Sequence, residues 1–199
     1  MQIILSDFMS LDGVVQAPGG KQEDVDGGFQ HGGWSMPFFD PVAMGTRIGE
    51  AMEGTDALLF GRRTWQTMAA AWPERDDGQD PFTTRMNSFP KYVASRTLTE
   101  QDLTWNNSRL LPADDALGAI RTLRDEPGGG LQVMGSTTLA HQLLSADLVD
   151  EINVMLEPIV LGGGKRLFPN DGTARAFELV SSAPAATGVL MCSYRRVRS

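Results

Sequence analysis

Short apolar runs alternate with amphipathic stretches along most of this chain. The apolar runs predict strands at 2–8, 56–60, 91–95, 108–111, 131–135, 149–161, 175–182 and 188–197. Apolar residues at helical spacing predict helices at 41–53, 62–72, 113–125 and 136–146. Apart from the neighbouring strands 91–95 and 108–111, strands and helices therefore alternate, and the chain ends in three strands without helices between them.

This order of elements predicts an α/β fold with a mainly parallel sheet and an antiparallel edge at its C-terminal end. The chain has 199 residues, enough to bury a sizeable core. It contains no internal repeat and no linker that would separate two domains. We therefore expect a single domain over residues 1–199.

The charge balance excludes some classes of partner. The chain has 17 Lys and Arg against 25 Asp and Glu, a formal net charge of -8, which argues against binding to nucleic acid or an anionic membrane. Cys192 is the only cysteine, so no intrachain disulfide forms, which fits a reducing cytoplasm. The apolar start of the chain is short and interrupted by Asp7, so we expect neither a signal peptide nor a membrane span.

A long Gly-rich segment separates the first predicted strand from the first predicted helix. It runs from Gly13 to about Asp40 and contains APGG, DGG and HGG. Loops of this length are uncommon in compact domains and are often functional. Because Phe29, Trp34, Phe38 and Phe39 are costly to leave in water, we expect this loop to fold over a ligand rather than to be a disordered insertion.

Three predicted strands end in similar small, hydroxylated or basic residues. These strand ends are FGRRTW (60–65), VASRTL (93–98) and VMGSTTL (133–139), and the first and third also open a helix. Glycine permits close backbone approach, free N–H groups at a helix start attract anions, and arginine grips phosphate oxygens with two hydrogen bonds. Ligands of open α/β sheets bind at the carboxyl ends of the strands.

One such strand end is weak support, because ordinary helix capping explains Gly135 and Ser136 equally well. All of them together, with Arg62, Arg63 and Arg96 in an acidic chain, indicate several phosphates, as in a dinucleotide with an extra ribose phosphate. The chain lacks GxGxxG, P-loop, HExxH and GxSxG motifs. Two histidines and one cysteine give no zinc site, so we expect no metal.

These stretches, in this order, resemble the dihydrofolate reductase-like superfamily. More closely, the chain is similar to the reductase domain of riboflavin-biosynthesis deaminase/reductases (the RibD C-terminal domain) and their stand-alone relatives. The stretches that carry the resemblance are FMSLDGVV (8–15), LLFGRRTW (58–65), VASRTL (93–98), VMGSTTLAHQLL (133–144) and DEINVMLEPIVLGGGKRLF (150–168).

The resemblance implies a three-layer α/β/α fold, NADPH as hydride donor and a homodimer. In this family the stretches above hold the pyrophosphate, the 2′-phosphate and the nicotinamide. It implies that the cofactor contacts Asp12, Gly13, Gly61, Arg62, Arg63, Thr64, Ser95, Arg96, Met134, Gly135, Ser136, Thr137, Thr138 and Leu139.

The predicted activity is hydride transfer from NADPH to a small heterocyclic or carbonyl substrate, of which a ribosylaminopyrimidine of the riboflavin pathway is one. The candidate catalytic acids are Asp40 and Asp12. The candidate substrate-side residues are Trp34, Phe38, Glu157 and Gly163. Asp40, Glu157 or ordered water supplies the proton. The alternatives are a nucleotide-binding sensor without turnover and, last, an interaction protein.

Overall fold

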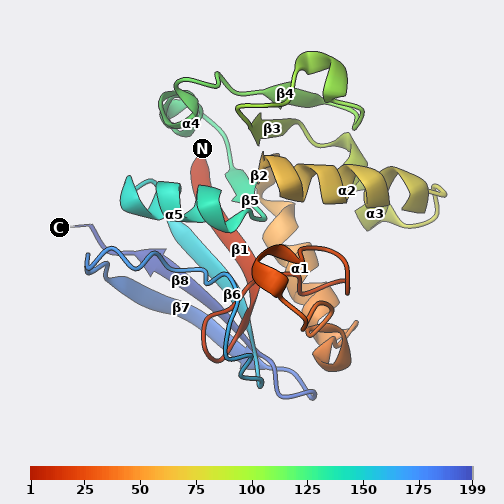
Figure 1. Cartoon of the computed structure of the whole chain (residues 1–199), viewed down its shortest axis with the longest axis vertical. Coiled ribbons are helices and arrows are strands. Elements are labelled where there is room, and N and C mark those ends of the chain that lie inside the picture. The colour runs from red at the N-terminus through yellow and green to blue at the C-terminus, as the bar shows by residue number, and fades with distance from the viewer. Residues whose placement is uncertain (199) are drawn as a thin grey trace.

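Eight strands form one sheet in the computed structural model, which describes residues 1–198. The strands are β1 (Gln2–Ser10), β2 (Thr55–Gly61), β3 (Lys91–Ala94), β4 (Ser108–Leu110), β5 (Gly130–Val133), β6 (Glu151–Glu157), β7 (Phe177–Pro184) and β8 (Leu190–Arg196). Their order across the sheet is β4-β3-β2-β5-β1-β6-β8-β7 (Figure 1). Strands β1 to β6 run parallel, and β8 and β7 form an antiparallel edge, so the predicted mixed, mostly parallel sheet is confirmed.

Helices pack on both faces of this sheet. One face carries α1 (Ala43–Glu53), α2 (Arg62–Arg75) and α3 (Pro81–Ser88), and the other carries α4 (Ala116–Asp125) and α5 (Thr137–Ser145) (Figure 1). In β2, Phe60 packs in one cluster with Trp65 of α2, whereas its neighbour Leu59 packs in another with Ile120 of α4. Burial on both faces explains why this strand is a continuous apolar run. No helix within residues 1–198 is long and apolar enough to cross a membrane.

The strand predicted at 149–161 is shorter in the structure. It ends at Glu157 because Pro158, which has no backbone N–H, cannot continue the ladder. The Gly-rich run that follows is a loop, and it lies against the segment after β1. Val15 N–H donates to the Lys165 carbonyl at 2.9 Å, and Val14 forms an antiparallel bridge with Arg166.

Two helix starts differ from the sequence prediction because aspartates cap them. Helix α3 was not predicted; Asp80 precedes it and its carboxylate accepts from the N–H groups of Phe82 and Thr83. Helix α4 begins at Ala116 rather than 113, since the Asp115 carboxylate accepts from Gly118 N–H as the N-cap. The start predicted at residue 113 was therefore wrong, and Asp114 and Asp115 both precede the helix.

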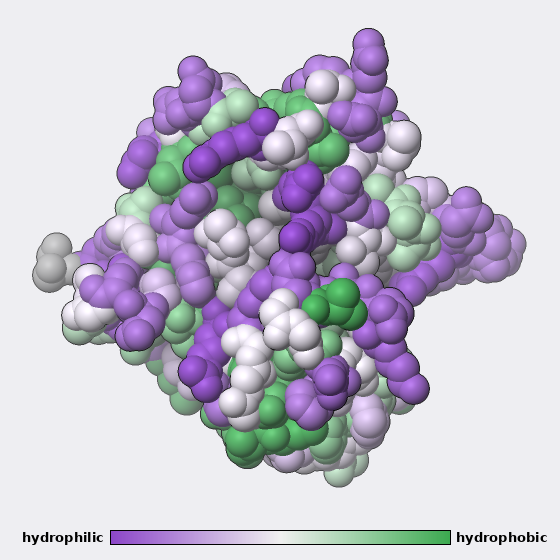
Figure 2. Space-filling model, viewed as in Figure 1, coloured by the Kyte–Doolittle hydropathy of each residue, from purple (hydrophilic) through white to green (hydrophobic). Residues whose placement is uncertain are grey.

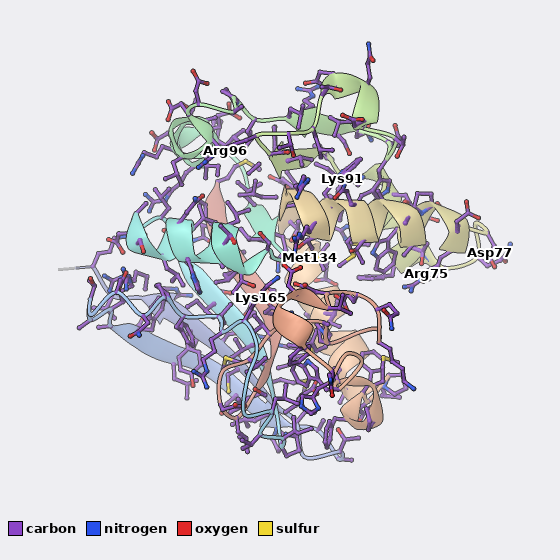
Figure 3. All side chains as sticks on the ribbon, viewed as in Figure 1. Arg75, Asp77, Lys91, Arg96, Met134 and Lys165 are labelled. Atoms are coloured by element: carbon purple, nitrogen blue, oxygen red, sulfur yellow. The ribbon has the colours of Figure 1, made fainter. Side chains whose placement is uncertain are left out.

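A buried lysine fixes the start of β3, the strand that leads to Arg96. The Lys91 side chain is fully buried, and its ammonium donates to the carbonyls of Asn87, Phe89 and Asn106 at 2.8–3.0 Å. The same group lies 4.3 Å from the centre of the Trp105 ring (Lys91 is labelled in Figure 3). Burial lowers the pKa of Lys91 to about 8, while the carbonyls and the ring favour its charged form.

Candidate functional site

The three strand ends singled out in the sequence lie side by side, at the carboxyl ends of the parallel strands. Strands β3, β2 and β5 are parallel neighbours, so the residues that follow them emerge side by side. The Gly61 N–H after β2 donates to the Gly135 carbonyl after β5 at 3.3 Å. Figure 2 shows a hollow on this face of the molecule, bordered mainly by hydrophilic side chains.

Glycine is required where two of these strand ends touch. A Cβ on Gly61 would lie 2.2 Å from Ser136 Oγ and 3.0 Å from Ser136 Cβ, so Ser136 would have to shift to admit any side chain there. Gly135 has φ +97°, and a Cβ there would lie 3.0 Å from Thr64 Oγ1. The missing side chains let α2 and α5 start beside each other at this edge.

The first turns of α2 and α5 supply free N–H groups at the same place. Gly61 is the N-cap of α2 and has no side chain to cap it. Ser136 is the N-cap of α5, as its sequence position predicts, but its hydroxyl makes no capping bond. The N–H groups of Thr137, Thr138 and Leu139 therefore remain free to bind an anion, although the Leu139 side chain itself is buried in the core.

The arginines near this edge fall into two classes. Arg62 and Arg96 are exposed, and neither takes part in an ion pair among residues 1–198. Arg63 instead pairs with Asp26 and lies 3.7 Å from Asp24, both in the long loop after β1. Figure 3 shows Arg96 beside α4, apart from Met134 and Lys165 at the centre of the molecule.

Asp12, expected near the nicotinamide, joins two loops. Its carboxylate accepts from the N–H groups of Leu161 at 3.0 Å and Gly162 at 2.9 Å, and from the Ser10 hydroxyl at 2.7 Å. The Leu161 amide and then the Ser10 hydroxyl lower the pKa of Asp12 to about 2. An acid that is ionised at neutral pH does not donate a proton. The geometry thus favours Asp12 as the group that holds the turn at Gly13, whose φ is +82°.

Asp40, the other candidate catalytic acid, lies at the start of α1. Its Oδ1 accepts from the N–H groups of Val42 and Ala43, both at 3.0 Å. These bonds fix the turn that leads into α1, whose N-cap is Val42. They favour a structural role for Asp40 over proton transfer.

Glu157, at the carboxyl end of β6, is a fully buried acid. It is paired in register with Ser10, the last residue of β1, so it lies beside the turn of Asp12 and Gly13. Its Oε1 accepts from the Ser35 hydroxyl at 2.5 Å, and its Oε2 has no partner among residues 1–198. Burial raises the pKa of Glu157 to about 7. Glu157 is therefore poised to give up a proton at neutral pH.

The other substrate-side candidates lie around Glu157 without forming one wall. Trp34 is buried, and its indole N–H donates to the Gln16 carbonyl at 2.8 Å. Phe38 is half-buried in an apolar cluster with Met44 of α1. Gly163 is exposed and lines a cavity of about 590 Å³ between its own loop and residues 26–31.

Asp7 is a residue that the sequence analysis did not assign to the site. It lies on β1 on the same side as Ile3 and Leu5, which are fully buried. The register of β1 with β5 places it level with Gly135, at the start of α5. Burial raises the pKa of Asp7 to about 8, and among residues 1–198 its carboxylate accepts only from Phe8 N–H. The sequence signal that could have identified Asp7 is an acidic residue within an otherwise apolar strand.

A second hollow, of about 520 Å³, lies at the opposite end of the strands. Its lining includes Arg47, Glu50 and Glu151 and none of the candidate cofactor or substrate residues. It opens near the amino ends of β1 and β5, where Gln2 and Gly130 begin these strands. In parallel sheets ligands bind at the carboxyl ends of the strands, so the strand ends at Gly61, Gly135 and Ser95 remain the candidate site.

The sheet order and the helices on both faces define a dihydrofolate reductase-like fold. A protein from Shewanella sp. PV-4, named as a riboflavin biosynthesis protein, is 23% identical with a TM-score of 0.70, and all of both chains is covered. A pyrimidine reductase-like protein from Corynebacterium diphtheriae is 13% identical with a TM-score of 0.61, over 100% of this chain and 92% of that one. Dihydrofolate reductase from Enterococcus faecalis, complexed with NADP(H) and RAB-propyl, is 15% identical with a TM-score of 0.61, over 99% and 97% of the two chains.

The sequence comparisons assign the family. The family model of the RibD C-terminal domain matches residues 1–191, so the chain belongs to this family of reductase domains. Among curated proteins, the uncharacterized protein YyaP of Bacillus subtilis (strain 168) is 28% identical over 198 residues, 97% of this chain and 94% of that protein. The resemblance inferred from the sequence is confirmed, and the protein is an oxidoreductase at the level of its family.

Proposed function

We propose that this protein is an NADPH-dependent reductase that binds its cofactor along the carboxyl edge of the sheet. One observation carries the proposal: the order in which the candidate residues follow one another across the carboxyl ends of the strands. From β3 through β2, β5 and β1 to β6, the edge presents Arg96, the start of α2, the start of α5, the turn at Gly13 and the acid Glu157. This is the linear order of 2′-phosphate, pyrophosphate, nicotinamide and substrate in a bound dinucleotide with its acceptor.

The residues present fit such a group. Strands lie about 4.8 Å apart, so the ends of β3 and β5 are roughly 10 Å from each other, a span that suits two phosphate sites of one molecule. The gap left by Gly61 and Gly135 admits a close backbone approach. The free N–H groups of Thr137 to Leu139 and of the first turn of α2 would hold the pyrophosphate, and Arg96, with Ser95, the 2′-phosphate. The dihydrofolate reductase of similar fold is a complex with NADP(H).

The bound dinucleotide supplies a hydride, and the chain positions the acceptor and supplies the proton. For a C=O or C=N acceptor, Glu157 would give its proton to the oxygen or nitrogen while the carbon received the hydride. The Glu157 carboxylate then takes a proton from water. The turn at Gly13, which Asp12 fixes through its bonds to the loop after β6, would lie beside the nicotinamide. The names of two neighbours of similar fold, a riboflavin biosynthesis protein and a pyrimidine reductase-like protein, favour an aminopyrimidine as acceptor.

Arg96→Ala tests the cofactor choice. Only NADPH carries the 2′-phosphate, so the variant is expected to bind NADPH about ten- to more than a hundredfold more weakly and NADH unchanged, since a charged hydrogen bond contributes about 1.5 to 3 kcal/mol. Dissociation constants measured by calorimetry check this. Arg75→Ala is the matched control, because Arg75 lies at the far end of α2 (Figure 3). Equal losses for both dinucleotides would remove Arg96 from the 2′-phosphate site.

A further inference from the structure

In the long loop after β1, the carboxylates of Asp24 and Asp26 form ion pairs with two cations beside the proposed cofactor site. Asp26 pairs with Arg63, in the first turn of α2. Lys165, in the loop after β6, donates to Asp24 at 2.5 Å and to Asp26 at 2.9 Å. Figure 3 shows Lys165 at the centre of the molecule, between α5 and the loop that follows β1. The Asp26 carboxylate thus bridges Arg63 and Lys165, so the anion between these two cations belongs to the chain itself.

The loop that carries these acids is closed on itself. Gly33 N–H donates to the Ala17 carbonyl at 2.8 Å, and Ser35 N–H donates to the Pro18 carbonyl at 3.1 Å. Inside the loop, the Gln16 amide donates to the carbonyls of Asp24 and Asp26 at 3.1 and 3.0 Å. These internal bonds favour movement of residues 16–35 as a unit.

The same unit covers the proposed proton donor. Ser35, near its end, donates to Glu157, whose side chain is 0% exposed. A substrate therefore cannot reach Glu157 while the loop is in this position. Movement of residues 16–35 would uncover the acid and open the space beside the turn at Gly13.

The ion pairs between this loop and the cations Arg63 and Lys165 are weak enough to exchange. The side chains of Arg63, Asp26, Lys165 and Asp24 are 53%, 44%, 34% and 23% exposed. Half-exposed ion pairs contribute only about 0.2 to 1 kcal/mol each. A phosphate carries more charge than a carboxylate and has additional N–H donors at the start of α2, so it competes for Arg63 effectively.

We propose that Asp24 and Asp26 form an anionic latch that imitates a cofactor phosphate. In the absence of cofactor, the latch holds residues 16–35 against Arg63 and Lys165 and keeps Glu157 covered by Ser35. Binding of the dinucleotide displaces the carboxylates and releases the loop, which orders the reaction: cofactor binds first and substrate second. This inference rests on the proposed function, because it needs a phosphate at Arg63.

The test measures NADPH affinity of the full-length double variant Asp24→Asn/Asp26→Asn. Without the competing carboxylates, NADPH is expected to bind about two- to tenfold more tightly than to the wild type. Asp77→Asn, which removes one carboxylate charge just beyond the distant end of α2 and so matches the single variant Asp26→Asn, is expected to leave the affinity unchanged (Figure 3). The single variant Asp26→Asn, expected to tighten binding by a smaller factor, replaces the double variant if that one does not fold.

A second measurement follows the loop itself. Trypsin cleaves after Lys21, which is exposed on this loop. The double variant is expected to be cleaved there faster than the wild type without any ligand. Wild-type protein that binds NADPH while the variants gain neither affinity nor cleavage overturns the latch and leaves the reductase proposal standing. Wild-type protein that does not bind NADPH overturns both.

Discussion

Glu157→Gln is expected to lower kcat by about 10²- to 10⁴-fold, the usual contribution of a general acid. The glutamine has nearly the same shape and can still accept from the Ser35 hydroxyl, but it has no proton to give. Cofactor affinity is expected to stay at the wild-type value, since Glu157 lies at the end of β6, beyond the residues proposed to bind phosphates. The measurement is steady-state NADPH oxidation with an aminopyrimidine or carbonyl acceptor.

The pH profile separates proton donation from packing. Burial raises the pKa of Glu157 to about 7, so the protonated acid is lost as the pH rises through that value. The wild-type kcat/KM, which reports the protonation state of the free enzyme, is therefore expected to fall above about pH 7, and the variant is expected to lose this dependence. Glu151→Gln is the matched control, because Glu151 lies on the same face of the same strand at its other end. A variant with wild-type kcat at all pH values would exclude Glu157 as the proton donor.

Gly61→Ala is expected to weaken NADPH binding by more than tenfold and to lower stability. The new Cβ would lie 2.2 Å from Ser136 Oγ, so the starts of α2 and α5 must move apart. Overpacking of this kind costs about 1 to 3 kcal/mol. The two starts are proposed to hold one pyrophosphate together, so a shift of either one disturbs both sets of N–H groups. Calorimetric titration with NADPH and a thermal melt of the free protein measure the two effects.

Gly49→Ala is the control for this prediction. Gly49 lies in α1, and no atom lies within 4 Å of a Cβ added there. Alanine is favoured over glycine inside a helix by about 1 kcal/mol, so this variant is expected to be at least as stable as the wild type and to bind NADPH normally. If Gly61→Ala bound NADPH as tightly as Gly49→Ala, the contact between the two helix starts would have no part in cofactor binding.

The sequence predicts those parts of the fold that depend on local pattern. The alternation of apolar runs and helical spacing gives the strands, four of the five helices and the antiparallel end. The sheet order could not be predicted, because β5 inserts between β2 and β1 through contacts between distant segments. Helix α3 was missed although Asp80 followed by Pro81 is a helix-start pattern.

The same division holds for the candidate site. Gly61, Gly135 and Arg96 could be found because glycine, hydroxyl and arginine at a strand end are local features. The partner of Arg63 could not be found, since Asp26 is 37 positions away in the chain. Burial decides the state of Glu157, and burial depends on how the long loop folds. Asp12 was expected near the nicotinamide for its position, and its bonds to the loop after β6 give it a more definite role.

A crystal structure of the protein with NADPH tests the central claim most directly. We predict that the pyrophosphate lies between the start of α2 at Arg62 and the start of α5 at Thr137, the 2′-phosphate at Arg96, and the nicotinamide beside Gly13. Arg63 is expected to contact phosphate in place of Asp26. A dinucleotide bound in the hollow near Arg47 at the amino ends of the strands, or no bound dinucleotide at saturating concentration, would contradict the account.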